Sequence, residues 1–245
     1  MAGQTAGIIV IGNEILSGKV TDENSPFLAS ELRRLGVELR RITTIPDDVE
    51  VIAAATREFH TGYDHVFTSG GVGPTHDDVT MEGIARGLGR RVIRHPELEE
   101  GIRRFVSDKV AVNAAHLKMA EVPEGADLIH DPSMGFPTIR VENIYILPGI
   151  PEILRKKFEG LRERFSEKPF FLRIIYTSWS ESMIAESLNQ TMAEFPELAL
   201  GSYPTMKNPE YRVKLTIESK DGDYVRRAFD RLLVLLPADA VVRTE

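Results

Sequence analysis

A glycine-rich segment followed by acidic residues carries the clearest chemical signal in this sequence. A short β-branched and aromatic run, residues 66–69, precedes residues 70–74, which contain too much glycine for a strand or a helix. A helix is predicted to begin at about Thr75 and to end near Gly89. Glycines let backbone N–H groups approach a ligand closely, and a helix start adds unpaired N–H groups and a positive dipole end. The segment therefore predicts an anion site, and phosphate is the usual anion there.

Acidic side chains follow the glycines where a common phosphate loop has a lysine. Asp77 and Asp78 come first, and Glu82 lies four residues after Asp78, so we expect Asp78 and Glu82 on one face of the predicted helix. Helix capping accounts for one aspartate, but not for two beside the glycines. Carboxylates repel phosphate unless a hard cation lies between them, and ligation by oxygen alone suits Mg²⁺ or Mn²⁺. We therefore expect a divalent cation here, Mg²⁺, Mn²⁺ or Co²⁺.

A second predicted strand leads to another candidate loop. Residues 7–11 form a continuous apolar run, typical of a strand covered on both faces, and Gly12, Asn13 and Glu14 follow it. Ligands bind beyond the carboxyl ends of parallel strands, so Glu14 is placed to face the same crevice as Asp78. A solvent-exposed glutamate without a role is an equally good interpretation of Glu14 from the sequence alone.

Two motifs resemble those of a known superfamily. Residues 70–80, Gly-Gly-Val-Gly-Pro-Thr-His-Asp-Asp-Val-Thr, resemble the signature of the molybdopterin-binding-like (MoCF-biosynthesis) superfamily. That superfamily includes MogA, the central domain of MoeA, the N-terminal domain of CinA and a domain of eukaryotic FAD synthase. The Gly-Pro-Thr-x-Asp-Asp form belongs to the last two, and His76 matches the FAD synthase type. Residues 12–16 and 143–152 resemble further motifs of these proteins, whereas residues 133–137 depart from the CinA type.

The resemblance extends the set of candidate residues. It implies an acidic ligand-site residue at Asp47, which by sequence pattern alone is a helix N-cap. Asp78 is the main candidate catalytic carboxylate, and the choice of general base stays open between Asp47 and Glu82. The expected metal ligands are Asp77, Asp78 and Glu14. The expected ligand-binding residues are Gly12, Asn13, Ser69, Gly70, Gly71, Gly73, Pro74, Thr75, His76, Thr80, Lys118, Pro148 and Gly149.

The order of predicted elements indicates two domains. Strands and helices alternate through residues 1–166, which predicts an α/β domain with a doubly wound, mostly parallel sheet, similar to MogA. Residues 166–169 form a plausible linker. Residues 169–245 follow a βαββαβ order, which predicts a small α+β domain. Residues 200–204 and 211–216 resemble the region after the molybdopterin-binding-like domain of eukaryotic FAD synthase.

Composition narrows the classes of function. The formal net charge of −7 disfavours nonspecific binding of nucleic acid, and no apolar run is long enough to predict a membrane span. The sequence has no cysteine, which excludes disulfides and thiolate metal sites and fits a cytoplasmic protein. Sites in the resembling superfamily often lie near subunit contacts, so we expect a homo-oligomer, a dimer rather than a trimer.

The glycine loop with its carboxylates favours a metal-dependent enzyme that acts on a phosphate ligand, and the resemblance implies a nucleotide pyrophosphatase that hydrolyses FAD or an ADP-ribose-like dinucleotide. The resemblance leaves two alternatives. One is molybdopterin binding or adenylyl transfer in molybdenum-cofactor biosynthesis, and the other is a nucleotide-binding module without catalysis. The fold alone does not choose among them, because one fold hosts many functions.

Overall fold

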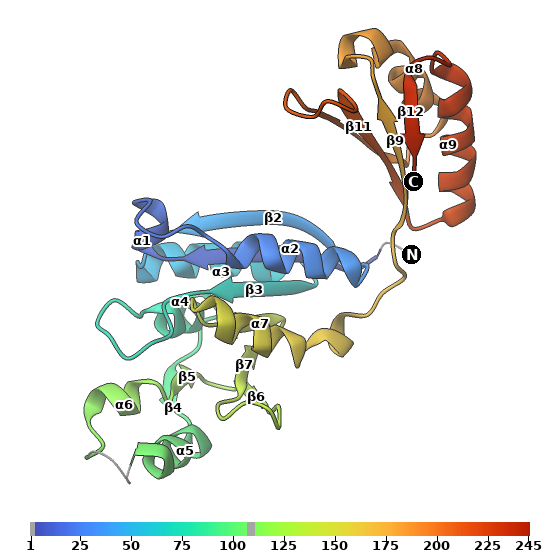
Figure 1. The fold of residues 1–245 in the computed structure, drawn as a ribbon. Helices are drawn as coiled ribbons and strands as arrows, with labels where there is room; N and C mark the ends of the chain where they lie inside the picture. The colour runs from blue at the N-terminus through green and yellow to red at the C-terminus, as the bar shows by residue number, and fades with distance from the viewer. Residues whose placement is uncertain (1–2, 107–110) are drawn as a thin grey trace. The chain divides into compact units, whose positions relative to one another are not determined.

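The computed structural model describes residues 3–106 and 111–245 of the chain (Figure 1). The chain divides into two compact units, with the boundary between Glu167 and Lys168. Within the described residues, every helix is too short or too polar to cross a membrane.

The first unit is built on a sheet of mixed direction. Four neighbouring strands run parallel, and two more pair antiparallel at one edge. In spatial order the strands are β2 (Glu38–Ile45), β1 (Thr5–Ile11), β3 (His65–Ser69), β8 (Ile144–Leu147), β7 (Thr138–Val141) and β6 (Asp127–Ile129). The doubly wound, mostly parallel sheet predicted from the sequence is confirmed.

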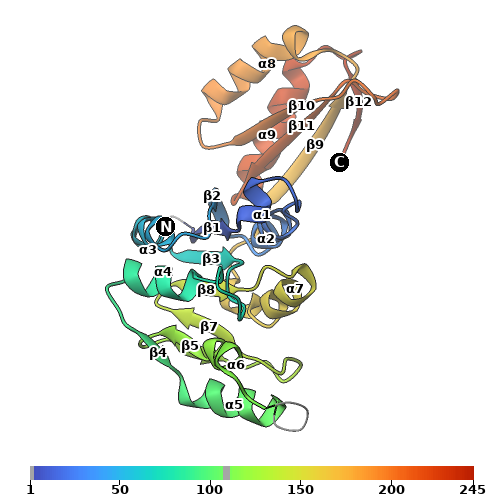
Figure 2. The same cartoon turned by 90° about the vertical axis from the view of Figure 1, so that its left-hand side faces the viewer.

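Helices cover both faces of this sheet because its central strands are apolar on both faces. Alternate side chains of a strand point to opposite faces. From β1, Ile8 packs with Leu28 on one face, while Ile9 packs with Ile52 on the other. The covering helices are α2 (Asn24–Arg34) and α7 (Pro151–Glu159) on the first face, and α3 (Val49–Gly62) and α4 (Thr80–Gly87) on the second. Figure 2 shows the two pairs on opposite sides of the sheet.

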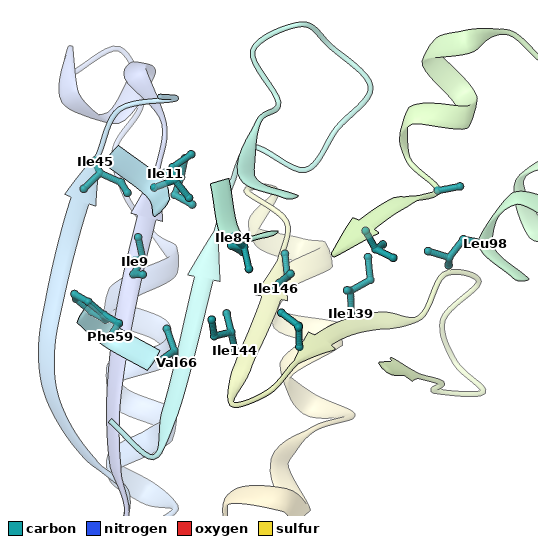
Figure 3. Packing of buried hydrophobic residues seen from close by; sticks show 14 of the residues in the cluster. Ile9, Ile11, Ile45, Phe59, Val66, Ile84, Leu98, Ile139, Ile144 and Ile146 are labelled. Carbon is teal, nitrogen blue, oxygen red and sulfur yellow. The ribbon is translucent and has the colours of Figure 1, made fainter. Parts of the chain in front are cut away.

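The core of the second face continues beyond the sheet. Figure 3 shows Ile9, Phe59 and Ile146 in one cluster that extends to Leu98. Leu98 belongs to α5 (Pro96–Val106), which lies in the sequence between the two strands of a small antiparallel sheet that the sequence pattern did not predict. Its strands are β4 (Val92–Arg94) and β5 (Glu121–Pro123), and α6 (Ala114–Lys118) precedes β5.

Two helix boundaries differ from the sequence-based expectation. In the sequence, Ser25 followed by proline predicts a helix that Ser25 caps. Helix α2 instead begins at Asn24, because the Asp22 carboxylate accepts the N–H groups of both Asn24 and Ser25. Pro151 suits the first turn of a helix that the sequence predicts to run to about Phe165. Helix α7 instead ends at Glu159, and a 3₁₀ helix (Arg162–Phe165) follows it. Side-chain caps of this kind are local competitors that periodicity does not register.

The second unit has the predicted βαββαβ order. Its elements are β9 (Phe171–Thr177), α8 (Glu181–Glu194), β10 (Ala199–Pro204), β11 (Val213–Ser219), α9 (Gly222–Leu235) and β12 (Val241–Thr244). The antiparallel sheet has the order β10-β11-β9-β12, as in ferredoxin-like domains. Its separate core includes Ile175, Leu215 and Leu232, all fully buried.

Candidate functional site

The candidate site lies where the parallel strands of the first unit end. Strands β1, β2, β3 and β8 point in one direction, so the loops after them gather at one edge of the sheet. The short helix α1 (Asn13–Leu16) also lies there, at the arrowhead end of β2 in Figure 1. Hydrogen bonds connect these loops directly: Gly12 N–H donates to Ile45 O at 3.1 Å, and Gly70 N–H donates to Leu147 O at 3.2 Å.

Two consecutive glycines form the start of the loop after β3. Gly70 and Gly71 have φ values of 105° and 64°, in the left-handed region that other residues rarely adopt. A Cβ on Gly70 would lie 2.1 Å from Ile11 O, and a Cβ on Gly71 would lie 2.3 Å from Thr80 Oγ1. Gly149, after β8, also approaches closely, since its Cβ would lie 3.4 Å from the Gly70 Cα. Only glycine therefore fits at Gly70 and Gly71 without strain.

Two of the expected ligand-binding residues support the loop from inside. Thr80 is fully buried, and its hydroxyl and N–H donate to the carbonyl oxygens of Gly70 and Gly71, at 2.9 and 3.1 Å. Ser69 is 2% exposed, and its hydroxyl accepts a hydrogen bond from the Asn24 side chain at 2.9 Å. Both side chains hold the loop in shape, and neither is open to solvent.

The helix after the loop begins later than predicted. The Asp78 Oδ2 atom accepts hydrogen bonds from the N–H of Thr75, at 2.8 Å, and from its hydroxyl, so residues 75–78 form a turn. Helix α4 begins only at Thr80 and ends at Gly87, and Gly89 with φ 66° closes it. The prediction that Asp78 and Glu82 share a helix face was therefore wrong, because Asp78 precedes the helix.

The predicted N-cap was also displaced by one residue. Asp48, not Asp47, caps α3, since its Oδ1 accepts the N–H groups of Glu50 and Val51 at 2.9 and 3.0 Å. The Asp47 Oδ2 atom instead accepts the N–H of Asn13 at 2.8 Å, which connects the loops after β2 and β1. Asp47 is therefore not the cap of α3, and its ligand-site role stays a prediction from the resemblance.

Two carboxylates consequently flank the glycines. A Cβ built on Gly71 would lie 3.5 Å from the Asp47 Oδ1 atom, and one built on Gly73 would lie 2.6 Å from the Asp78 Oδ2 atom and 3.1 Å from its Oδ1 atom. In both aspartates Oδ2 is the atom held by a backbone N–H. Each side chain is thus oriented by one oxygen and keeps the other beside the loop.

The remaining acidic candidates lie further out. Glu14 and Asp77 are exposed. The pKa of Asp77 is lowered, first by a hydrogen bond from the Thr75 side chain and then by the backbone N–H of Asp77 itself. The charges of His76 and Lys118 lower it further. Glu82 forms an ion pair with Arg86 at 3.0 Å. Across residues 3–106 and 111–245, no group of three or more His, Asp or Glu side chains is arranged to hold a metal ion. A cation would therefore need oxygen ligands from a bound phosphate as well as from the protein.

A pocket of about 410 Å³ opens beside the loop. It is lined by Gly71, Gly73, His76, Asp78, Glu82 and Lys118 among the expected residues. The Lys118 ammonium donates to Thr75 O, so it holds the turn and adds positive charge next to Asp78. Pro74 is exposed on the same loop, whereas Gly12, Asn13 and Pro148 are outside this lining.

Asn24 is a candidate that the sequence pattern did not reveal. Its Nδ2 donates to Ser69 Oγ at 2.9 Å and to Gly149 O at 2.8 Å, so it joins the loops after β3 and β8. Its Oδ1 atom is buried without a hydrogen-bond partner in the described chain. Unpartnered buried acceptors are rare, but this atom is fully buried, so Asn24 is a candidate for positioning the two loops and not for contacting a ligand. In the sequence Asn24 precedes Ser25 at a helix start, and nothing there indicates its distant partners.

Comparison with known proteins gives both units a family context. Residues 7–167 match the family described as probable molybdopterin binding domain, and residues 169–245 match the one described as FAD synthase, middle domain. A protein of Archaeoglobus fulgidus is 35% identical over 94% of this chain and 96% of its own length. A probable FAD synthase of Caenorhabditis elegans is 31% identical over 97% of this chain, which spans only 51% of that relative.

A solved structure is similar to the larger part of the chain. The protein CinA, of unknown function, from Thermoplasma acidophilum superposes with a TM-score of 0.60 at 29% identity. The match covers 67% of this chain and 100% of that one. The superfamily resemblance predicted from the glycine loop is thereby confirmed. The chain belongs to the family of probable molybdopterin binding domains, and its second unit is similar to the middle domain of FAD synthase.

Proposed function

We propose that this chain is a divalent-metal-dependent hydrolase that cleaves the pyrophosphate bond of FAD or an ADP-ribose-like dinucleotide. One observation carries the proposal: Asp47 and Asp78 flank the glycine loop, each held by one oxygen with the other beside the loop. A phosphate site alone does not need two oriented carboxylates. A phosphate site that shares a cation with the protein does.

The loop supplies donors for the phosphates. The N–H groups of Gly71 and Gly73 make no hydrogen bond to the described part of the chain, so they are available to phosphate oxygens. Lys118 adds a positive charge at the same pocket. Asn24 supports the loop by donating to Ser69 and to the carbonyl oxygen of Gly149.

The carboxylates divide into two roles. Asp78 is the proposed inner ligand of a cation that completes its coordination with phosphate oxygens and water, because Asp77 and Glu14 are not arranged with Asp78 to hold a metal ion by themselves. Such a cation, when bound, neutralises phosphate charge and lowers the pKa of a bound water. Asp47 is the proposed general base, because the Glu82 carboxylate is already engaged by Arg86 at 3.0 Å. In the reaction, water adds to one phosphorus, its proton passes to Asp47, and the other phosphate leaves.

The direct test incubates purified protein with FAD or ADP-ribose in the presence of Mg²⁺, Co²⁺ or EDTA. We expect FMN and AMP from FAD, identified by mass, and no products in EDTA. Hydrolysis that persists in EDTA would contradict the role of the metal. No hydrolysis of any dinucleotide under any metal would overturn the catalytic proposal and leave a nucleotide-binding module. Light scattering at micromolar concentration tests the expected homodimer.

The family match supports a second candidate function. Residues 7–167 match a domain described as molybdopterin-binding, and a pterin phosphate would suit the same glycine loop. Molybdopterin with ATP and Mg²⁺ is therefore a further arm of the assay. Binding or adenylyl transfer there, without hydrolysis of dinucleotides, would favour this alternative.

A further inference from the structure

A second, larger pocket adjoins the glycine-loop pocket in the first unit. Its volume is about 740 Å³, and its surface is mainly apolar. Its floor is part of the core cluster, including Leu98, Ile139 and Ile146, which Figure 3 labels. Small-molecule sites usually have a volume of about 300–1,000 Å³ and a mainly apolar lining, and this pocket has both properties.

The two pockets share part of their lining. Val72, Met81 and Met119 line both of them, and Val72 directly follows Gly71 of the loop. A ligand whose phosphates bind at the loop can therefore extend past these side chains into the second pocket. A dinucleotide has this form, because its pyrophosphate lies between two groups that carry rings.

The side chains of the second pocket suit a large planar ring. Met81, Met119 and Met134 are flexible thioethers that contact aromatic rings favourably. Phe136 adds an aromatic face. The ionisable lining residues include Glu97 and His130, which pair with each other at 2.8 Å.

Lys157 holds one wall of this pocket in place. It is 7% exposed, and its ammonium group donates to the carbonyl oxygens of Phe136 and Pro137, both at 2.8 Å. An ammonium group has three donors, so one N–H is left for a ligand oxygen. The wall that Lys157 holds is residues 133–137, the segment that departs from the CinA type.

We propose that this second pocket binds the isoalloxazine ring of a flavin dinucleotide, and that Met134 and Phe136 give the site its preference for FAD over ADP-ribose. The proposal rests on the proposed function, whose substrate it narrows. Isoalloxazine has three fused rings and an apolar dimethylbenzene edge, which fits the thioether and aromatic lining. Its pyrimidine edge has carbonyl oxygens for the remaining Lys157 donor. Adenine is smaller and lacks carbonyl groups, and ADP-ribose has only a sugar in place of the flavin.

Two glycines in the lining allow the pocket to be filled without disturbing the loop. A Cβ on Gly101 or Gly135 has no heavy atom within 4 Å, so Gly101→Phe and Gly135→Phe each add a ring to the pocket lining from a position where the new Cβ meets no neighbour. Phenylalanine is also a better helix former than glycine, which favours folding of Gly101→Phe within α5. Gly62→Phe is the matched control, because Gly62 is equally open but lies at the end of α3, outside both linings.

The experiment measures FMN binding by fluorescence anisotropy in EDTA, and then KM for FAD and ADP-ribose with metal. We expect Gly101→Phe and Gly135→Phe to weaken FMN binding and raise KM for FAD by at least about tenfold, the usual scale for a misfit in an apolar pocket. KM for ADP-ribose should stay within about twofold, and Gly62→Phe should match the wild type in every measurement.

Three results would overturn the inference: no FMN binding by the wild type, equal weakening in Gly62→Phe, or equal loss for FAD and ADP-ribose. The last would mean that adenine occupies the pocket. The FMN measurement does not depend on catalysis. FMN binding that Gly135→Phe weakens, in a protein that hydrolyses no dinucleotide, would support the flavin pocket while refuting the proposed hydrolase.

Discussion

The two units of the chain both combine a sheet with helices, but their strands run in different directions. In the first unit β1, β2, β3 and β8 are parallel, so the loops after all four meet at one edge. In the second unit every neighbouring pair is antiparallel, so consecutive strand ends alternate between two edges. Both pockets described above are lined by the first unit alone. Parallel strands concentrate loops from distant parts of the sequence, and that concentration creates the site.

The same side-chain chemistry has different consequences in the two units. Asp221 accepts the N–H groups of Asp223 and Tyr224 and caps α9. Asp78 likewise accepts the N–H of Thr75, but it does so beside Gly73 and in a pocket. We therefore expect a substitution of Asp78 to reduce the activity of the protein, and the same substitution of Asp221 to reduce only the stability of the second unit.

Truncation of each core should show the largest effects. Phe67 is fully buried against Tyr145, with ring centroids 5.4 Å apart, and Leu232 is fully buried in the second core. Phe67→Ala should cost about 3–5 kcal/mol and Leu232→Ala about 2–5 kcal/mol, each in the unfolding of its own unit. Calorimetry combined with the FAD assay measures both. Loss of hydrolysis in Leu232→Ala at a temperature where the first unit is folded would break the comparison.

Removal of one charge at the loop should have the next largest effect. Asp78→Asn keeps the turn, since asparagine accepts hydrogen bonds nearly as well as aspartate at such positions, but it removes the charge. Metal-dependent hydrolysis should fall at least about 100-fold, because charge stabilisation is among the largest catalytic effects. Asp221→Asn is the matched control and should retain full activity. If Asp78→Asn is equally active, Asp78 only closes the turn with Thr75.

The sequence predicted the elements better than their junctions. The strand before Gly70 and the alternation of strands and helices follow from apolar patterning, because each strand is covered on both faces. The start of α4 was misplaced because Asp78 and Thr80 use side-chain hydrogen bonds that compete with helix formation. The cap of α3 was assigned to Asp47 because both neighbouring aspartates suit the position, and only the loop from Asn13 distinguishes them.

Features that depend on distant contacts could not be predicted. Asn24 bonds to Ser69 and Gly149, which are 45 and 125 residues away in the sequence. The second pocket is lined by residues of α5 and by Met119, both from the segment between β4 and β5, which pair with each other. Strands of three residues give too little periodicity to be recognised, so neither the small sheet nor the pocket is visible in the sequence.

A buried lysine gives the first unit a pH dependence of its own. Burial lowers the pKa of Lys157 to about 8 from 10.5, against the opposing charge of Asp131. Between these values the unfolded chain binds more protons than the folded one, so this group makes stability rise with pH across that window. Lys157→Met should remove the rise, although it also leaves two carbonyl groups unpaired and lowers stability at every pH. Urea unfolding at pH 8 and pH 10 measures the slope, and parallel curves for wild type and variant would contradict the assignment.

Matched helix caps should give the smallest effects and the finest test of the comparison. Asp48 and Asp221 each accept two backbone N–H groups at the start of a helix of 14 residues, one in each unit. Asp48→Ala should cost about 1 kcal/mol in the unfolding of the first unit, the typical value for an N-cap.

Asp221→Ala should lower only the unfolding temperature of the second unit. Protonation of Asp221 at acidic pH should remove the same cap and lower that temperature in the wild type. A hydrogen bond from the backbone N–H of Tyr224 lowers the pKa of Asp221 in the folded protein. The Asp221 cap therefore stabilises the second unit at any pH above the ordinary pKa of an aspartate, and this stabilisation is lost as the pH falls through the lowered pKa of the folded state. Calorimetry of both variants resolves the two transitions. A change in FAD hydrolysis in Asp221→Ala, or a shift of both transitions by either variant, would show that the two units do not act separately.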